Sequence, residues 1–489
     1  MNRIKIYFTS LFVLFVLASF QNIEAETASS TIASGTRHFK AVINTGVPPR
    51  ARGQKDVLQL RCAPLPVVRV GFIGLGMRGQ GAVYRFTRID GVEIKALCDL
   101  EAYNIKSVQS ELAQQNRPLP DEYLGEEAWK KVCERDDIDL IYICTHWALH
   151  TPIAVYAMKH GKHVAIEVPA ACTLSECWQL VNTAEKTQRH CMMLENCCYD
   201  FFEMATLNMA QQGLFGEIVH VEGAYIHDLR DLNFNDRLKK DNEGNTFIDP
   251  NTHLPQLTGY WNHWRLKENT EHDGNLYPTH GLGPVCQALN IHRGDRMDYL
   301  VSLSSNQFNM TAYAKEQFGD TSIQAQTDYK KGDMNITLIK TVKGKSIMIQ
   351  HDVSSPRTYS RIHLISGTRG YAQKYPEQAL AFSPRTHSPM LKEQMDSVLK
   401  VYEHPIAIEI GEKAKAVGGH GGMDFIMDYR LVYCLQHGLP LDQDVYDAAE
   451  WCSIIELSRM SVNNHSTPVQ VPDFTRGAWD KIKGLNWAK

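Results

Sequence analysis

The glycines in the run GLGMRG at 74–79 are spaced as in turns that bind phosphate. The run follows the apolar stretch 67–73, which is typical of a buried strand. In a G-x-G-x-x-G turn the first glycine makes the tight turn, the second lets the backbone approach a pyrophosphate, and the third lets the next helix pack on the strand. That helix directs its free N–H groups at the phosphates. The spacing therefore predicts a dinucleotide site.

Asp99 supports this prediction and indicates which dinucleotide binds. It ends a second strand-like stretch, 92–98, and lies twenty residues after Gly79. A carboxylate at this distance accepts hydrogen bonds from the adenosine ribose and repels the extra phosphate of NADP, so it favours NAD. Arg78 keeps NADP open as an alternative, because a guanidinium inside the turn also binds phosphate.

The composition is that of an ordinary soluble globular protein. The chain has 489 residues, of which 43% are hydrophobic and 22% are charged, so two domains are expected. The net charge of −4 gives no reason to expect nucleic acid or an anionic membrane surface as a partner. Twelve cysteines are too dilute for a disulfide scaffold, and no spacing of His, Cys, Asp or Glu is typical of a metal site, so no metal is predicted.

The first 25 residues have the pattern of a signal peptide. A short basic start, 2–5, precedes the apolar stretch 6–20, and Ala25 is a plausible cleavage point. The stretch is shorter than the roughly 20 residues of a membrane span, and an uncleaved anchor is the alternative. Export to the periplasm or beyond the cell is expected, with no membrane span after cleavage. Free NAD is scarce there, so a cofactor must be retained and regenerated in place. Residues 26–66 are predicted to form a linker or arm.

Strand and helix patterns alternate over 67–200, which is typical of a Rossmann domain with a doubly wound parallel sheet. A strand over 138–144 is followed by a loop and by a helix over 152–160. Ligands of such sheets bind beyond the carboxyl ends of the strands. Three loops are expected to face the cofactor together from that position: 145–150, 167–169 and 195–199.

The pattern changes over 201–475, the predicted second domain. Apolar and polar residues alternate there with a period of two, which suits an open, mostly antiparallel sheet. The stretches with this pattern are 218–229, 299–308, 335–353 and 361–371. Two amphipathic helices, 423–437 and 445–463, are expected to return to the first domain. The predicted fold is therefore a Rossmann α/β domain followed by an α+β domain, and its open sheet favours a homodimer.

The chain resembles the Rossmann-type sugar oxidoreductases that include glucose–fructose oxidoreductase and inositol dehydrogenase. In that superfamily a Glu-Lys-Pro motif follows the fifth strand, and its lysine assists proton transfer. This sequence has Glu167-Val168-Pro169 at that place. The missing lysine argues against ordinary dehydrogenase chemistry.

One branch of the superfamily fits better. Over residues 67–475 the chain is similar to the NAD-dependent α-N-acetylgalactosaminidases of glycoside hydrolase family 109. Five runs carry the similarity: LENCCY at 194–199, GAYIHDLR at 223–230, WR at 264–265, YPTHG at 277–281 and HGG at 420–422.

The resemblance implies a hydrolase that uses redox chemistry. Such an enzyme oxidises C3 of the sugar with NAD, eliminates across C1 and C2, adds water and restores the hydride. No second substrate is consumed, which suits an exported enzyme. Enzymes of this kind are an exception to the paired-carboxylate rule of glycosidases.

The resemblance also assigns roles to residues of this chain. The cofactor residues include the glycine turn and Asp99 that the spacing already indicates. The full set is Gly74, Gly76, Met77, Arg78, Gly79, Asp99, Trp147, Ala148, Leu149, His150, Glu167, Val168, Asn196 and Tyr277. The sugar pocket consists of Tyr225, Arg265, Tyr277, Pro278, Thr279, His280 and Tyr359. We expect His280 to be the acid/base group, because histidine side chains titrate near neutral pH. Tyr225, Glu195 and Tyr359 are candidates for relaying protons or supporting an enolate.

These assignments compete with structural interpretations. Glu195 could cap the turn after its strand, Tyr225 could belong to the packing of a sheet, and Trp147 and His150 could cover the start of a helix. Two other functions also stay open: a sugar oxidoreductase that releases the ketone, and a sugar-binding protein that keeps its cofactor as a structural relic. In each case the expected ligand is a small sugar or a glycan rather than nucleic acid.

Overall fold

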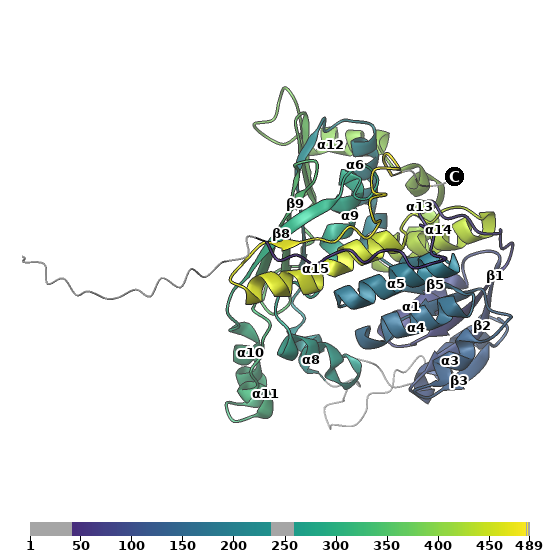
Figure 1. Ribbon diagram of the computed structural model, residues 1–489. Helices are drawn as coiled ribbons and strands as arrows, with labels where there is room; N and C mark the ends of the chain where they lie inside the picture. The colour runs from purple at the N-terminus through teal and green to yellow at the C-terminus, as the bar shows by residue number, and fades with distance from the viewer. Residues whose placement is uncertain (1–41, 236–258, 486, 488–489) are drawn as a thin grey trace, which may run out of the picture. The chain divides into compact units, whose positions relative to one another are not determined.

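The computed structural model describes residues 42–235, 259–485 and 487 (Figure 1). The predicted signal peptide, 1–25, and the first part of the predicted arm lie outside the described residues. None of the described helices is both long enough and apolar enough to span a membrane. Two sheets organise the described chain, and they are formed by residues 68–193 and 218–470.

The first sheet is parallel throughout, with its strands in the order β3-β2-β1-β4-β5-β6. The strands are β1 (Val68–Ile73), β2 (Val92–Asp99), β3 (Asp121–Leu124), β4 (Leu140–Ile143), β5 (His163–Ile166) and β6 (Cys191–Met193). The helices between them are α1 (Met77–Phe86), α2 (Ala102–Gln114), α3 (Ala128–Cys133), α4 (Trp147–Lys159) and α5 (Leu174–Thr187). Every residue of β4 and β5 is buried, as expected for strands with both faces covered. The predicted Rossmann architecture is confirmed.

The strand order reverses at β1. The chain runs outward from β1 to β2 and β3, and then returns to β4 on the other side of β1. The carboxyl ends of β1 and β4 therefore lie at the switch point of the sheet, where ligands of doubly wound folds bind. Three turns surround this point: 74–76 after β1, 99–101 at the end of β2, and 144–146 after β4.

The prediction of a loop over 145–150 is wrong in its second part. Helix α4 already begins at Trp147, so 147–150 form its first turn, and Pro152 lies inside the helix. The missing N–H of Pro152 costs one backbone hydrogen bond. Tertiary packing offsets this cost, because Ile153 and Ala154 on the same helix are fully buried.

The second sheet has the strand order β13-β12-β11-β7-β10-β9-β8-β14. Neighbouring strands are antiparallel except β7 and β10, which are parallel. The strands are β7 (Ile218–Ile226), β8 (Met297–Ser304), β9 (Asn335–Thr341), β10 (Ser346–Asp352), β11 (Leu364–Gly367), β12 (Gly370–Gln373), β13 (Ala379–Phe382) and β14 (Val469–Gln470). The predicted open, mostly antiparallel sheet is confirmed.

The predicted single strand over 361–371 is wrong. β11 and β12 form a hairpin, because the chain turns between Gly367 and Gly370. β13 has no counterpart in the predicted pattern, since its four residues are all apolar and show no alternation. The helices in this part are α6 (Phe201–Gln211), α7 (Arg230–Phe234), α8 (Trp264–Glu271), α9 (Thr279–Leu289), α10 (Asn309–Phe318), α11 (Ile323–Gln326), α12 (Lys392–Val401) and α13 (Pro405–Val417).

Two C-terminal helices pack against the first sheet and its helices. α14 (Met423–His437) contacts α1 and β1, and α15 (Val445–Asn463) contacts β6 and runs beside α5 (Figure 1). Both helices begin and end at the residues that the periodicity predicts. The stretch 42–66 contains no helix or strand of its own. Ile43 forms an isolated bridge with Val469 of β14, and further along the N–H of Val57 donates to the hydroxyl of Tyr446 in α15 (3.2 Å).

Candidate active site at the switch point of the parallel sheet

The glycine turn has the geometry that a bound pyrophosphate needs. Gly74 has a φ of +89°, and a Cβ there would lie 2.5 Å from the carbonyl oxygen of Cys144. A Cβ at Gly79 would lie 2.0 Å from the carbonyl oxygen of Gly74, so α1 packs directly on the turn. At Gly76, which lines the crevice above the turn, a Cβ would meet no protein atom within 4 Å. The second glycine therefore leaves the space into which phosphates approach the backbone.

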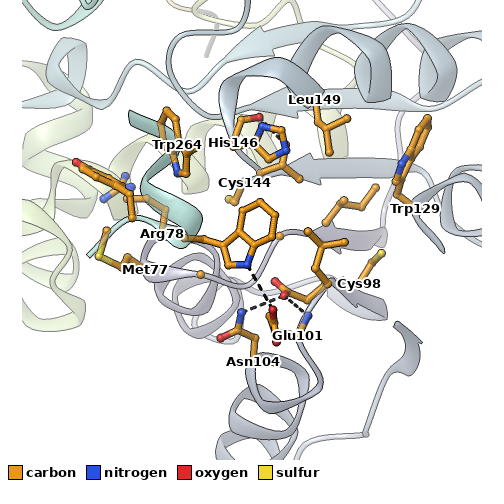
Figure 2. A pocket seen from close by; sticks show the side chains of 18 of the residues that line it. Met77, Arg78, Cys98, Glu101, Asn104, Trp129, Cys144, His146, Leu149 and Trp264 are labelled. Carbon is orange, nitrogen blue, oxygen red and sulfur yellow. Dashed lines mark hydrogen bonds between the residues drawn. The ribbon is translucent and has the colours of Figure 1, made fainter. Parts of the chain in front are cut away.

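Figure 2 shows side chains that line this crevice, which encloses about 1000 Å³ of empty space including its opening to solvent. Six predicted cofactor residues line it: Gly74, Gly76, Met77, Arg78, Asp99 and Leu149. The other eight do not line it: Gly79, Trp147, Ala148, His150, Glu167, Val168, Asn196 and Tyr277. Among the described residues, no side chain caps the first turn of α1, so its N–H groups stay available to phosphate. The crevice therefore fits the phosphate and adenosine parts of NAD.

Asp99 connects two of the turns around the crevice. Its Oδ2 accepts the N–H of Leu75 (2.6 Å), and its Oδ1 accepts the N–H of Glu101 (2.8 Å) and the side-chain N–H of Asn104 (3.0 Å). A carboxylate has about four acceptor positions, so it can accept one further donor such as a ribose hydroxyl. The same negative charge disfavours a phosphate on that ribose.

Arg78 is already paired with carboxylates. Its Nε lies 3.0 Å from Glu167 Oε1, and its Nη1 lies 3.1 Å from Asp424 Oδ2. Because these two acids neutralise the guanidinium, Arg78 is a poor anchor for the extra phosphate of NADP. NADP, the alternative cofactor that Arg78 suggested in the sequence, therefore loses support.

Asp424 holds the side chains next to Arg78 in place. It lies in the first turn of α14, is almost completely buried, and accepts hydrogen bonds from the side chains of Arg78 and Asn196. Burial alone would raise the pKa of Asp424, but the charge of Arg78, a hydrogen bond from His420 and the charge of Arg85 hold the pKa well below its usual range. Asn196, a predicted cofactor residue, is therefore fixed by an ionised partner from the C-terminal part of the chain.

His280 and Glu195 form a hydrogen-bonded pair. His280 Nδ1 lies 2.7 Å from Glu195 Oε1. Glu195 is completely buried and also accepts the N–H of Cys197 (3.1 Å), so it caps the short helix η1 (Asn196–Tyr199) as well. Burial alone would raise the pKa of Glu195, but His280 and the hydrogen bonds to the carboxylate lower it overall. An ionised Glu195 orients the imidazole ring and leaves Nε2 for proton transfer.

Two tyrosine rings lie against the ring of His280. The ring centre of Tyr225 is 5.3 Å away and that of Tyr277 is 4.9 Å away. Helix α9 holds His280 in this position because it lies directly on β7, where a Cβ at Gly281 would be 2.3 Å from the backbone nitrogen of Ala224. Burial raises the pKa of Tyr225 to about 12. The phenol of Tyr225 therefore stays protonated and acts as a hydrogen-bond donor.

Arg265 adds a cation to this cluster. Its guanidinium carbon lies 4.7 Å from the ring centre of Tyr277 and 5.8 Å from that of Tyr225. Nη1 donates to the hydroxyl of Tyr260 (2.8 Å), whereas the buried Nη2 has no hydrogen-bond partner among the described residues. A buried donor without a partner is costly. A sugar oxygen at this place would satisfy it.

The cluster is next to the crevice. Trp264 lines the crevice (Figure 2). It packs edge-on against Trp147, with ring centres 5.0 Å apart. Trp147 in turn stacks on Tyr277, with ring centres 5.9 Å apart and planes inclined by 23°. Tyr277 contacts His280. The structure therefore brings the predicted sugar residues and the predicted cofactor residues into neighbouring positions.

Some predicted site residues have other surroundings. The ring nitrogens of His150 lie 2.8 Å from the carbonyl oxygen of Pro169 and 2.9 Å from that of Thr145, so His150 holds two loops together. This favours its structural interpretation. Tyr359 is 39% exposed and lies at the edge of the cluster, 5.1 Å from the ring of His227. Of the remaining positions, Ala148 lies in the first turn of α4, Val168 follows β5, and Pro278 and Thr279 begin α9.

Two residues of the site have no predicted role. His227 Nδ1 lies 3.1 Å from the hydroxyl of Tyr225, and burial lowers the pKa of His227. The two residues are two positions apart at the end of β7, and side chains with that spacing point to the same face of a strand. This spacing is the signal that would have found His227. The signal for Asp424 is weaker: an acid two residues after the glycine-rich run at 418–422, where a helix begins.

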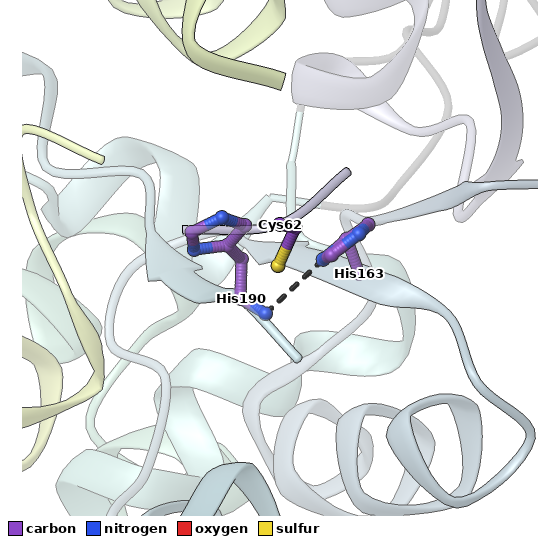
Figure 3. A group of neighbouring side chains, drawn as sticks. All are labelled: Cys62, His163 and His190. Carbon is purple, nitrogen blue, oxygen red and sulfur yellow. Dashed lines mark hydrogen bonds between the residues drawn. The ribbon is translucent and has the colours of Figure 1, made fainter. Parts of the chain in front are cut away.

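Three groups of His, Cys, Asp or Glu in the described part of the chain have the spacing of metal ligands. One is the Glu195, Cys197 and His280 group of the site itself. In the group of Cys62, His163 and His190 (Figure 3), His163 Nδ1 already accepts the backbone N–H of His190 at 3.1 Å. That nitrogen is therefore engaged in a hydrogen bond. The third group consists of His292, Asp444 and Asp447. The absence of a metal from the reaction stays a prediction.

Two family profiles match the chain. The profile described as Glycosyl hydrolase 109, C-terminal domain, matches residues 199–481. The profile described as Oxidoreductase family, NAD-binding Rossmann fold, matches residues 68–195. Together they cover both sheets.

Curated relatives and solved structures agree with these profiles. An α-N-acetylgalactosaminidase of Bacteroides fragilis is 57% identical over 88% of this chain and 96% of its own length. A glycosyl hydrolase family 109 protein of Porphyromonas gingivalis is 50% identical over 92% of this chain and 93% of its own length. A levoglucosan dehydrogenase in complex with NADH and L-sorbose shares the fold, with a TM-score of 0.57 at 15% identity over 83% of this chain and 100% of its own.

These matches confirm the resemblance that the sequence motifs carry, and they confirm NAD as the cofactor of the Rossmann part. The chain therefore belongs to glycoside hydrolase family 109.

Proposed function

We propose that this protein removes terminal α-linked N-acetylgalactosamine, or a closely related sugar, and that it uses NAD as a cofactor that is returned unchanged in each cycle. The observation that carries the proposal is the His280–Glu195 pair, 2.7 Å between Nδ1 and Oε1, placed beside the crevice of the glycine turn. The name of the Bacteroides fragilis relative supports the choice of sugar.

NAD bound in the crevice supplies a hydride acceptor and donor for C3 of the sugar. The residues proposed to hold it are the glycine turn 74–79, the N-terminus of α1 and Asp99. Arg78 lines one end of the crevice. Its carboxylate partners Glu167 and Asp424 lie behind it, and Asp424 also binds Asn196. The nicotinamide half is assigned to this end because the sugar residues begin there.

His280 is the proposed acid/base group. Its Nδ1 is held by an ionised Glu195, so Nε2 accepts the proton of the C3 hydroxyl during oxidation and returns a proton to the C3 oxygen at the end of the cycle. Glu195 acts as a positioning residue, since it reaches the sugar through His280. This division of roles explains how an acid at the start of η1 serves both as a helix cap and in the reaction.

The carbonyl formed at C3 makes the C2 proton acidic. When a base removes that proton, a double bond forms between C1 and C2, and the bond from C1 to the leaving oxygen breaks. Water then adds to C1, and a proton returns to C2. The protonated phenol of Tyr225 and the Nη2 of Arg265 are placed as donors to the developing enolate. Tyr359, at the edge of the cluster, is the remaining candidate for a proton relay.

A net sugar oxidoreductase is the second candidate function. The NAD-binding fold is compatible with it, because the solved structures with the same fold include sugar dehydrogenases. Val168 stands where that superfamily carries an acid/base lysine, and it is only 7% exposed. A valine cannot transfer a proton, so this observation favours the hydrolase.

The experiment is a panel of α- and β-nitrophenyl sugars incubated with the purified protein and no added NAD. Release of nitrophenol from the α-N-acetylgalactosaminide without added cofactor, and without accumulation of NADH, supports the proposal. Accumulation of NADH together with a keto sugar would support the oxidoreductase. A sugar-binding protein with a relic cofactor would bind members of the panel and release nitrophenol from none.

We also propose export and self-association. Export is supported by the pattern at 1–25, and N-terminal sequencing of the secreted protein should begin after Ala25. Self-association with a second copy is supported by the outer face of the second sheet, where Leu303, Ile336 and Leu338 are exposed. Light scattering should give the mass of a dimer, and Leu338→Glu should shift it to that of a monomer. A wild-type monomer would contradict this proposal.

A further inference from the structure

Trp261 contacts both walls of the cofactor crevice. Its indole Nε1 donates to Glu101 Oε1 (3.4 Å), and its ring stacks on that of His146, with centres 6.0 Å apart and planes inclined by 19°. All three side chains line the crevice, and Figure 2 shows Glu101 and His146 among them. Trp261 comes from η2 (Trp261–His263), at the start of α8, far along the chain from both partners.

The strand order shows that the end of β1 lies between the two residues that Trp261 contacts. Glu101 follows β2 and His146 follows β4, and β1 lies between β2 and β4 in the sheet. A side chain that contacts both therefore spans the end of β1, where the glycine turn leaves its space for phosphates. Glu101 also donates its N–H to Asp99 (2.8 Å), so Trp261 lies at the end of the crevice that Asp99 assigns to the adenosine ribose.

The turn that carries Trp261 has an unusual backbone. Asn262 and His263 both lie in the left-handed region, with φ of 50° and 49°. Residues with a Cβ persist in this region when their surroundings hold them there, and such positions are common at ligand clamps. Here the N–H of His263 donates to the carbonyl of Tyr260 (2.9 Å), and His263 Nδ1 lies 3.2 Å from the carbonyl of Asn233.

The same turn reaches the sugar cluster. The residue that follows it, Trp264, lines the crevice and packs against Trp147. Arg265, the next residue, lies over Tyr277. One short stretch of chain, 261–265, therefore contacts the adenosine end of the crevice and the tyrosine cluster in turn.

We propose that Trp261 is a cofactor-binding residue that covers the adenosine half of NAD and, together with Glu101, slows its release. A purine base stacks on the face of an aromatic ring, and such a contact changes affinity about 10-fold to 100-fold. The carboxylate of Glu101, close to that of Asp99, adds to the repulsion of a ribose phosphate. An enzyme that returns its cofactor in each cycle gains from slow release, because one molecule of NAD then serves many turnovers. The inference rests on NAD binding and not on the identity of the sugar.

The experiment measures release of NAD from the purified holoprotein. Wild type, Trp261→Ala, Glu101→Gln and a control, Trp479→Ala, are loaded with labelled NAD and chased with excess unlabelled NAD. Trp479 is the matched control because it is also partly buried and lies outside the crevice. We expect Trp261→Ala to release the label about 10-fold to 100-fold faster than wild type. Glu101→Gln should release it faster as well, and Trp479→Ala should match wild type.

Release at the wild-type rate from both Trp261→Ala and Glu101→Gln overturns the proposal. Equal acceleration in Trp479→Ala also overturns it, because retention would then depend on general packing. If Trp261→Ala does not fold, Trp261→Phe keeps an aromatic ring but removes the indole N–H and part of the stacking surface, and its release should then be faster than that of wild type. The readout is independent of glycosidase activity, so an incorrect choice of sugar would leave these release rates unchanged.

Discussion

The substitution Glu195→Gln removes one buried charge and keeps the shape of the side chain. In the structure Glu195 is completely buried, and its Oε1 lies 2.7 Å from His280 Nδ1. A hydrogen bond to a charged group contributes about 1.5–3 kcal/mol. The glutamine oxygen can keep a neutral hydrogen bond to His280, which contributes about 0.5–1.5 kcal/mol. If the difference of about 1–1.5 kcal/mol orients His280 in the transition state, its loss lowers kcat about 5-fold to 13-fold. The glutamine oxygen can still accept the N–H of Cys197, so the cap of η1 is expected to survive.

The assay is the steady-state hydrolysis of nitrophenyl α-N-acetylgalactosaminide, with bound NAD and thermal unfolding measured on the same samples. Glu195 does not line the crevice, so the content of NAD should not change. KM should change little, because the carboxylate does not contact the sugar in the proposed arrangement. A fall in kcat with unchanged KM and unchanged NAD is the pattern expected of a positioning residue.

Glu450→Gln is the matched control. Glu450 is almost completely buried, and its Oε2 lies 2.8 Å from Nδ1 of a second histidine, His292, in a pair that does not line the crevice. This substitution should lower the free energy of unfolding and leave kcat unchanged. An unchanged kcat in Glu195→Gln, or equal losses of kcat in both variants, would refute the reasoning.

Two further predictions concern the glycine turn and the buried histidines. Gly79→Ala places a Cβ 2.0 Å from a backbone carbonyl oxygen and should lower the free energy of unfolding by about 1–3 kcal/mol. Gly76→Ala places a Cβ where no protein atom lies within 4 Å, so this variant should keep nearly full stability. It should nevertheless lose NAD in dialysis, because the added methyl group fills the space for phosphates. Loss of stability in Gly76→Ala, or full retention of NAD, would contradict the role given to that glycine. Burial lowers the pKa of His163 to about 4 and that of His190 to about 3, from 6.5. The unfolded chain therefore takes up protons below pH 6.5 that the folded chain does not, and each histidine costs about 2 kcal/mol of stability at pH 5. Denaturant titrations at pH 7 and pH 5 should show this contribution, and His163→Asn should reduce the loss of stability by about 2 kcal/mol; an equal loss in His163→Asn would show that His163 does not contribute to it.

The parts of the fold that could be predicted are those with local signals. The start of helix α5 at Leu174 has such a signal, because Thr173 and Glu176 form a capping box there. Helix α14 ends where predicted because Gly438 adopts a left-handed conformation after it. The start of α4 was mispredicted because Pro152 is a local signal for a helix boundary, and burial of the helix outweighs it.

The pairing of side chains in the site could not be predicted by spacing. Arg78 looks like a phosphate ligand in the sequence, but its carboxylate partner Asp424 is 346 positions away. The same holds for His280 and Glu195, which are 85 positions apart and meet because α9 packs on β7 and η1. Such contacts follow from the packing of whole elements. The motifs identified the residues, and the fold determines which of them touch.

The most direct test of the account is hydrolysis of an α-N-acetylgalactosaminide deuterated at C2, with no NAD added. The released sugar should carry hydrogen from water at C2, because the C2 proton is removed and replaced in each turnover. Full retention of deuterium at C2 in the product would contradict the proposed elimination and, with it, the use of NAD as a recycled cofactor.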